Sequence, residues 1–208
     1  MAAGLLPSSK RLAHKGYDMI LTHGANSIPR DSVVIDGTRY KTVKIGTQLW
    51  MAENLNSRFD FPLGTDKNPP RCSYYDGDES TYGKYGLLYN GYAIYLLSSA
   101  SYKAQYFPNW HVPSTSEINQ LLTFTGSSAA ALKSATEWNG TDVYGFNALP
   151  SGYYNDSTYI DMGSYFWMGS SKSSFNSDTN YLALGSEERI YNGTRSKGCQ
   201  VSIRLVHD

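Results

Sequence analysis

Histidine and cysteine are the residues of this 208-residue chain that could carry nucleophilic or metal chemistry. The four histidines are scattered at positions 14, 23, 111 and 207, and the two cysteines are Cys72 and Cys199. A nucleophile needs a base placed beside it, zinc needs Cys or His ligands at close spacing, and the sequence shows neither pattern. We therefore expect no catalytic residue, metal or other cofactor, and we interpret His111, between Trp110 and Val112, as a histidine satisfied within the fold.

Tyrosine is the residue type that stands out, with 18 copies against seven phenylalanines. Nine of them fall between Tyr74 and Tyr106. A tyrosine ring fills half-buried strand positions well, but its apolar face and polar tip also suit surfaces that bind wet, amphipathic ligands. Both interpretations remain open for this stretch.

A second tyrosine-rich region lies between Gly152 and Asn192 and mixes aromatic with amide, carboxylate and guanidinium side chains. Such mixtures combine stacking surface with adaptable hydrogen bonding, as in antibody paratopes, while an ordinary polar loop surface is the plainer alternative. The predicted ligand-binding residues are Tyr154, Asn155, Asp156, Tyr159, Tyr165, Phe175, Asn176, Asp178, Asn180, Tyr181, Arg189, Tyr191 and Asn192.

The composition excludes several classes of protein. Charged residues make up 17% of the chain and the net charge is zero, so nucleic acid is not an expected partner. Apolar runs such as Ala129–Leu132 are far shorter than the ~20 residues that span a bilayer. A chain rich in Tyr, Ser and Asn is typical of an extracytoplasmic β-rich or α+β protein.

Residues 1–30 differ from the rest, because four basic residues there face a single acidic one, Asp18. The segment shows neither helical nor strand periodicity, so we expect an arm or linker, which could contact an assembly or a second copy, ahead of a domain over residues 31–208. A secretory signal needs a longer apolar run than Met1–Leu6. We expect either a signal removed from this chain or export by another route, such as inside a virion.

The domain begins with strand patterns. Residues 33–35 and 39–45 flank Asp36-Gly37, a pair suited to a tight hairpin turn, and a further strand is expected over residues 48–51. A loop rich in Pro, Gly and Asp should cover residues 56–83. Residues 87–98 are apolar, with tyrosines at near-helical spacing, which predicts a helix.

The second half opens with the clearest helix signal in the chain. Ser114 and Glu117 form a capping box, Gly126 should end that helix, and a short Ala-rich helix is expected over residues 128–135. Strands and loops follow, and we expect a last strand over residues 200–206. The buried positions predicted for the capped helix are Ile118, Leu121, Leu122 and Phe124, and for the last strand Val201, Ile203 and Leu205.

Six short stretches, in this order, resemble the Fibrobacter succinogenes major paralogous domain, a family of bacterial surface proteins, over roughly residues 35–208. They are Tyr40–Leu55 (YKTVKIGTQLWMAENL), Tyr85–Asn90 (YGLLYN), Trp110–Ser114 (WHVPS), Gly145–Gly152 (GFNALPSG), Tyr165–Trp167 (YFW) and Val201–Val206 (VSIRLV). The resemblance implies an α+β, C-type-lectin-like fold with two main helices, antiparallel strands and long loops. Trp50, Trp110, Phe146 and Trp167, inside these stretches, should be largely buried.

The chain departs from the family at its cysteines. Members often carry one Cys just before the Trp-His-Val-Pro stretch and another near the end, where this chain has Tyr106 or Phe107 and Leu205, so apolar packing should replace that bridge. Cys72 and Cys199 are equally compatible with a disulfide of their own and with free thiols.

Two stretches of the sequence could offer ligands to calcium. Two acidic stretches, residues 76–79 and 155–156, offer the oxygen ligands that calcium prefers. The Glu-Pro-Asn and Gln-Pro-Asp motifs of calcium-dependent sugar-binding lectins are absent from the sequence, so we interpret both stretches as solvated loops.

Fold alone does not decide among the activities found in proteins with the fold that the resemblance implies. Our first hypothesis is a non-catalytic adhesin or lectin-like protein that binds a surface glycan or protein receptor, displayed on a bacterial surface or phage virion. It could be the variable protein of a diversity-generating retroelement. The alternatives are a relative of the formylglycine-generating enzymes, although the two cysteines lie in no matching motif, and a structural pilus or tail subunit.

Overall fold

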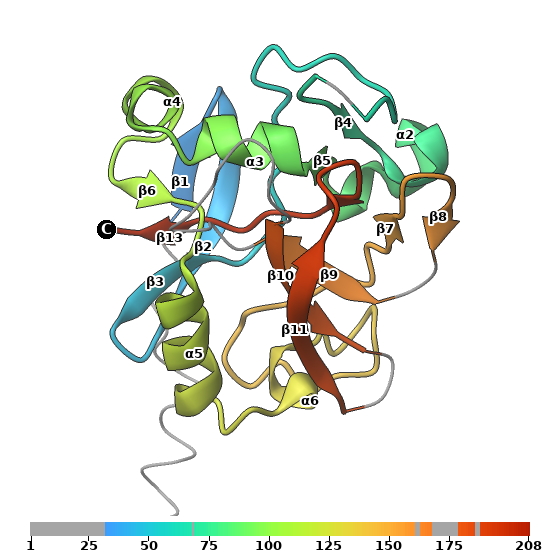
Figure 1. Ribbon diagram of the computed structural model, residues 1–208. Coiled ribbons are helices and arrows are strands. Elements are labelled where there is room, and N and C mark those ends of the chain that lie inside the picture. Colours follow the sequence, from blue (N-terminus) through green and yellow to red (C-terminus); the bar gives the residue numbers. More distant parts are fainter. Residues whose placement is uncertain (1–31, 68, 161–162, 168–178, 186–187) are drawn as a thin grey trace, which may run out of the picture.

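The computed structural model describes residues 32–67, 69–160, 163–167, 179–185 and 188–208. For Ser164, Tyr165 and Trp167 it describes the strand but not the side chains. Three sheets of antiparallel strands and several short helices make an α+β fold (Figure 1). The expected arm of residues 1–30 lies outside the described residues, so the division into arm and domain stays a prediction.

The first sheet contains the hairpin that the Asp36-Gly37 pair predicts. Both turn residues have positive φ, 49° and 77°, and Ile35 pairs with Thr38 across the turn. This hairpin and the third strand are therefore confirmed. In spatial order the sheet consists of β1 (Ser32–Ile35), β2 (Thr38–Ile45), β3 (Gln48–Met51), β13 (Val206–His207) and β6 (Trp110–His111).

A second five-stranded sheet corrects the helix expected over residues 87–98. Residues 87–90, the first four of that range, are buried, and Leu88–Asn90 form strand β5. Asn90 then caps helix α3 (Gly91–Leu97) by accepting a hydrogen bond from the amide of Ala93 at 3.0 Å. A short apolar run fits a buried strand and a helix equally well. Here pairing with strands elsewhere in the chain makes residues 88–90 a strand. The sheet order is β4 (Cys72–Ser73), β5 (Leu88–Asn90), β12 (Gln200–Val201), β7 (Tyr153–Tyr154) and β8 (Tyr159–Ile160).

Three further helices follow α3 in the middle of the sequence. Helix α4 (Ala100–Tyr106) was not predicted, and α6 (Ala129–Leu132) lies within the expected Ala-rich helix. Helix α5 (Thr115–Phe124) has the predicted capping box, with Gly126 just past its end at a φ of 65°. Phe124 corrects the predicted stripe: it is 52% exposed, because its ring lies on the surface against Tyr144.

The C-terminal segment, residues 200–207, corrects another expectation. It forms two two-residue strands in different sheets, with a parallel bridge between Ser202 and Phe166 of the remaining sheet. This connector therefore touches all three sheets, and its residues 200–206 are all buried. The predicted buried positions Val201, Ile203 and Leu205 are confirmed. The residues between them are buried as well, because a segment covered on both sides has no solvent face.

The third sheet has three strands in the order β11-β10-β9, which places β11 at an edge. Residues 191–194 in the middle of β11 are exposed, whereas Leu182, Ala183 and Leu184 of β10 are buried. The strands are β9 (Ser164–Trp167), β10 (Thr179–Leu184) and β11 (Ile190–Arg195).

The core contains the predicted aromatic residues whose side chains are described. Trp50, Trp110 and Phe146 are each at most 5% exposed, and the Trp167 side chain lies outside the description. Phe107 and Leu205 are buried in one apolar cluster, as expected for packing in place of a bridge. Among the described helices, none has the length and apolar character needed to cross a bilayer.

Candidate functional site

Five half-buried tyrosines from two distant parts of the chain meet at one surface, which we call the tyrosine cluster. Tyr75, Tyr82 and Tyr85 come from η1 (Tyr75–Gly77), α2 (Glu79–Tyr82) and η2 (Gly83–Tyr85), and Tyr154 and Tyr159 come from β7 and β8. The ring centroids of neighbours are 4.9 Å apart for Tyr75 and Tyr82, 5.1 Å for Tyr75 and Tyr159, and 5.1 Å for Tyr154 and Tyr159. Tyr85 continues the row at 6.3 Å from Tyr82. In Figure 1, α2 lies beside β7 and β8.

The first three rings are positioned by capping and turn chemistry. Asp78 caps α2 by accepting hydrogen bonds from the amides of Ser80 and Thr81 at 2.8 and 3.2 Å. Hydrogen bonds from Ser80 and Thr81 lower the pKa of Asp78 to about 2. Asp76 and Gly77, the last two residues of η1, take positive φ values of 54° and 70° and turn the chain toward α2. The carboxylate of Asp78 therefore serves the helix cap, and no group of three or more possible metal ligands occurs among the described residues.

The other two rings stand on the β7–β8 hairpin. Tyr154 pairs directly with Tyr159, and the side-chain oxygen of Asn155 accepts hydrogen bonds from the amides of Ser157 and Thr158 at 3.3 and 3.0 Å. Such an Asx turn closes a hairpin locally. Asn155, predicted to bind ligand, therefore shapes the turn that presents Tyr154 and Tyr159.

A glycine lets the two halves of the cluster touch. Gly152 has a φ of 62°, and a Cβ there would lie 2.5 Å from the Tyr75 ring and 2.8 Å from the carbonyl oxygen of Ile160. Only a residue without a side chain fits this contact. Tyr159 adds a hydrogen bond from its hydroxyl to Ser73 Oγ at 3.1 Å, and burial raises the pKa of Tyr159.

Asp156 ties the hairpin to the segment between β11 and β12. It has a φ of 78°, and its carboxylate accepts a hydrogen bond from Ser196 Oγ at 2.8 Å. Its other oxygen lies against Gly198, where a Cβ would come within 1.7 Å. Asp156 therefore holds the turn of the hairpin against residues 196–198.

The face of β7 opposite the cluster carries a different contact. Successive strand residues point to opposite sides, so Tyr153 leaves the cluster and packs under Arg195, whose guanidinium lies 4.0 Å from the Tyr153 ring and 4.7 Å from the Tyr181 ring. Tyr181 of β10 thus shares a cation–π contact with β7. Of the predicted site residues, Tyr154 and Tyr159 therefore lie on one side of β7, and Tyr181 belongs to the contact on the other side.

The remaining predicted residues do not join the cluster. Asn180 is half-buried, and Arg189, Tyr191 and Asn192 are exposed on or before the edge strand β11. Phe175, Asn176, Asp178 and the side chain of Tyr165 lie outside the described residues. Tyr75, Tyr82 and Tyr85 were not among the predicted site residues, although the density of tyrosine between positions 74 and 106 was the signal that could have found them.

Comparison with known families agrees with the short stretches noted in the sequence. Residues 43–207 match the Fibrobacter succinogenes major domain. The chain belongs to this family. No curated protein and no solved structure matches the chain.

The two cysteines of this Fibrobacter succinogenes major domain are free and buried, so the Cys72–Cys199 disulfide considered from the sequence is not formed. Cys72 pairs with Tyr89 on one side of β5, and β12, which follows Cys199, pairs with β5 on the other side. Strands two places apart are separated by about 9–10 Å, whereas a disulfide needs Cα atoms about 4.4–6.8 Å apart. Burial raises the pKa of each thiol to about 11.

His111 in the family's Trp-His-Val-Pro stretch is fully engaged, as expected. Its Nδ1 lies 2.5 Å from Asp208 Oδ1, and its Nε2 lies 2.7 Å from Glu117 Oε1. Burial raises the pKa of Glu117, but hydrogen bonds from Ser114 and the charge of His111 outweigh it and leave that pKa lowered. Asp208 also accepts a hydrogen bond from Lys103 Nζ at 3.2 Å. His111 thus joins β6 to the capping box of α5.

Proposed function

We propose that this Fibrobacter succinogenes major domain is a non-catalytic ligand-binding module with a C-type-lectin-like fold, displayed on a bacterial surface or phage virion. The observation that carries the proposal is the tyrosine cluster, in which residues as far apart in sequence as Tyr75 and Tyr159 converge on one row of rings. Family membership and the succession of early strands, middle helices and late strands support the fold assignment.

The cluster has the properties of a recognition surface. Its rings pack in tilted arrangements, at interplanar angles of 54–60° for the three closest pairs, so each ring is supported by its neighbours before a ligand arrives. Each ring remains partly exposed, so it can offer an apolar surface and a hydroxyl together. Rigid amphipathic rings bind with little loss of conformational entropy, which suits a surface glycan or a protein receptor.

The enzyme alternative has less support. Oxidation of a substrate by a cysteine pair needs accessible thiols that can react with each other, whereas Cys72 and Cys199 are buried on opposite sides of β5. Incubating the chain with a sulfatase-type cysteine peptide separates the two ideas. We expect no conversion of the peptide, and any turnover would contradict the binding-only proposal.

We also propose that the exposed edge strand β11, rich in polar side chains, belongs to a region that a diversity-generating retroelement varies. Tyr191 is 47% exposed, and Asn192, Gly193 and Thr194 beside it are exposed too. Substitutions there would disturb few buried contacts. Sequencing the neighbouring DNA tests this part: we expect a reverse transcriptase gene and a template copy of the C-terminal coding region that differs at adenines, and a neighbourhood without both would contradict it.

The binding proposal itself is tested on an array that carries bacterial glycans beside purified receptor ectodomains. We expect saturable binding of the folded chain to at least one class of spot and loss of that binding after heat denaturation. Absence of binding to both classes would leave the structural-subunit alternative as the better account.

A further inference from the structure

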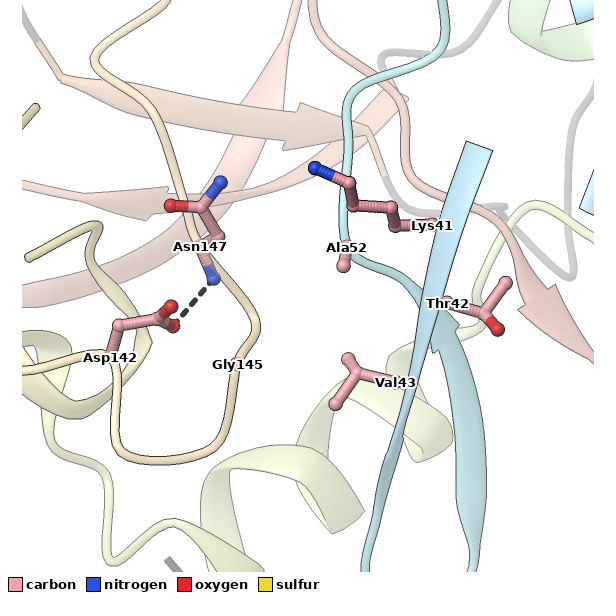
Figure 2. Close-up of a pocket in the computed structure, with 7 residues that line it drawn as sticks. All are labelled: Lys41, Thr42, Val43, Ala52, Asp142, Gly145 and Asn147. Carbon is pink, nitrogen blue, oxygen red and sulfur yellow. Dashed lines mark hydrogen bonds between the residues drawn. The ribbon is translucent and has the colours of Figure 1, made fainter. Parts of the chain in front are cut away.

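A polar hollow of about 190 Å³ lies between strand β2 and the loop of residues 142–147, apart from the tyrosine cluster. Figure 2 shows side chains from the two walls on either side of the space. Because a water molecule takes about 30 Å³ of liquid volume, the hollow has room for about six waters, which is enough for a small amino acid together with some of its solvent. It is lined by Lys41, Thr42, Val43, Ala52, Asp142, Gly145 and Asn147.

The loop wall is held in a strained shape. Asp142 and Asn147 take positive φ values of 45° and 52°, which non-glycine residues adopt at a cost and mostly where the surrounding structure fixes them. Asp142 accepts a hydrogen bond from the amide of Asn147 at 2.7 Å, and its carbonyl accepts one from Gly145 at 3.0 Å.

A buried cation fixes the same loop from behind. Arg204, 1% exposed, donates hydrogen bonds to the carbonyls of Phe146 and Asn147 and to Asn54 Oδ1. Burial lowers the pKa of Arg204 to about 9, and the charges of Asp142 and Glu53 oppose that change. The loop wall is therefore preformed, which reduces the cost of ordering it when a ligand binds.

The strand wall is equally well fixed at its backbone. Ala52 donates to the carbonyl of Lys41 at 2.8 Å, and the amide of Lys41 donates to Glu53 Oε2 at 2.7 Å. The Lys41 ammonium is mostly exposed and lies 3.8 Å from Glu53, so it can turn to a ligand at little cost, since exposed ion pairs of this kind contribute little.

Opposite charges thus face the hollow from opposite walls, with the ammonium of Lys41 on one and the carboxylate of Asp142 on the other, and the small apolar side chains of Val43 and Ala52 between them. A simple anion would also face the carboxylate of Asp142, and a simple cation would also face the ammonium of Lys41. We propose that the hollow binds a small zwitterion, a free amino acid of about the size of alanine, whose carboxylate meets Lys41 and whose ammonium meets Asp142.

The test is a titration of the isotopically labelled chain with L-alanine, followed by the amide NMR resonances of Gly145 and Asn147. We expect saturable shifts at millimolar L-alanine, and shifts at least tenfold weaker with acetate or with methylamine, which carry one of the two charges each. Lys41→Met and Asp142→Asn should each weaken L-alanine binding at least tenfold. Asparagine keeps an oxygen for the Asn147 amide, so Asp142→Asn preserves the loop.

The control is Lys44→Met, which removes an exposed lysine from the same strand and should leave binding unchanged. Thermal unfolding within a few degrees of wild type confirms that each variant is folded. The proposal is overturned if L-alanine leaves these resonances unmoved, if acetate or methylamine binds as tightly as L-alanine, or if Lys41→Met and Lys44→Met have equal effects.

Discussion

The family stretches and the tyrosine cluster are built from similar aromatic residues but are held in different ways. Trp50, Phe146 and Arg204 are almost fully buried, and Arg204 is bonded to two backbone carbonyls. The rings of the cluster are half-buried and rest mainly on one another. Most of the residues that reveal the family thus maintain its scaffold, while four of the five rings of the cluster lie outside the family stretches and Tyr85 alone belongs to both.

The largest expected difference between the two regions is in stability. Trp110→Ala should lower the free energy of unfolding by about 3–5 kcal/mol, because removing a large buried side chain leaves a cavity. Tyr82→Ala, a truncation in the cluster, should cost less than about 1.5 kcal/mol, since its ring is already partly solvated. Denaturant titration of both variants measures the gap. Equal losses would show that the cluster is part of the core.

Gly152→Ala tests the glycine contact at which the two halves of the cluster meet. A positive φ costs alanine about 1–2 kcal/mol, and the new methyl group would also push Tyr75 away from Tyr159. Gly126→Ala is a matched control, because Gly126 has a similar φ of 65° but nothing within 4 Å of the added Cβ. We expect Gly152→Ala to be the more destabilised variant and to change the near-ultraviolet circular dichroism of the tyrosines. Indistinguishable variants would contradict the contact.

The stability of the scaffold should also fall in acid, because His111 lies between the carboxylates of Glu117 and Asp208. Glu117 and Asp208 have lowered pKa values in the folded chain, below ordinary values of 4.5 and 3.8. Stability from these two groups is therefore fully present above those ordinary values and is lost as the pH falls through the lowered ones. Glu117→Gln should be less stable than wild type at pH 7 and should lose less stability between pH 5 and pH 2. Parallel stability curves would exclude this linkage.

The smallest expected effect concerns the thiols. Since Cys72 and Cys199 are unbridged, adding a reductant should leave the melting temperature unchanged to within about a degree. Ellman titration should count two thiols in the unfolded chain and react slowly with the folded one, because burial raises both pKa values to about 11. A reductant-dependent melting temperature would mean that a bridge forms after all.

Local signals in the sequence were sufficient for the elements that local chemistry decides. The Asp36-Gly37 hairpin and the Ser114–Glu117 capping box were predicted correctly, since turn geometry and capping involve residues close in the chain. The strand over Leu88–Asn90 and the division of residues 200–207 between two sheets were not, because pairing with strands more than 100 residues away determines them. The cluster was half predicted for the same reason: Tyr154 and Tyr159 were named, whereas Tyr75 and Tyr82 reach them only through the folded chain.

The most direct test of the account compares three proteins on the glycan and ectodomain array. They are the wild type, a Tyr82→Ala/Tyr154→Ala double variant, and Tyr106→Ala, which removes a half-buried tyrosine of α4 that hydrogen-bonds Asp60 away from the cluster. We predict that the double variant remains folded and loses at least tenfold in binding, while Tyr106→Ala binds as the wild type does. Binding that survives in the double variant, or is lost equally in both variants, would contradict the assignment of the ligand surface to the tyrosine cluster.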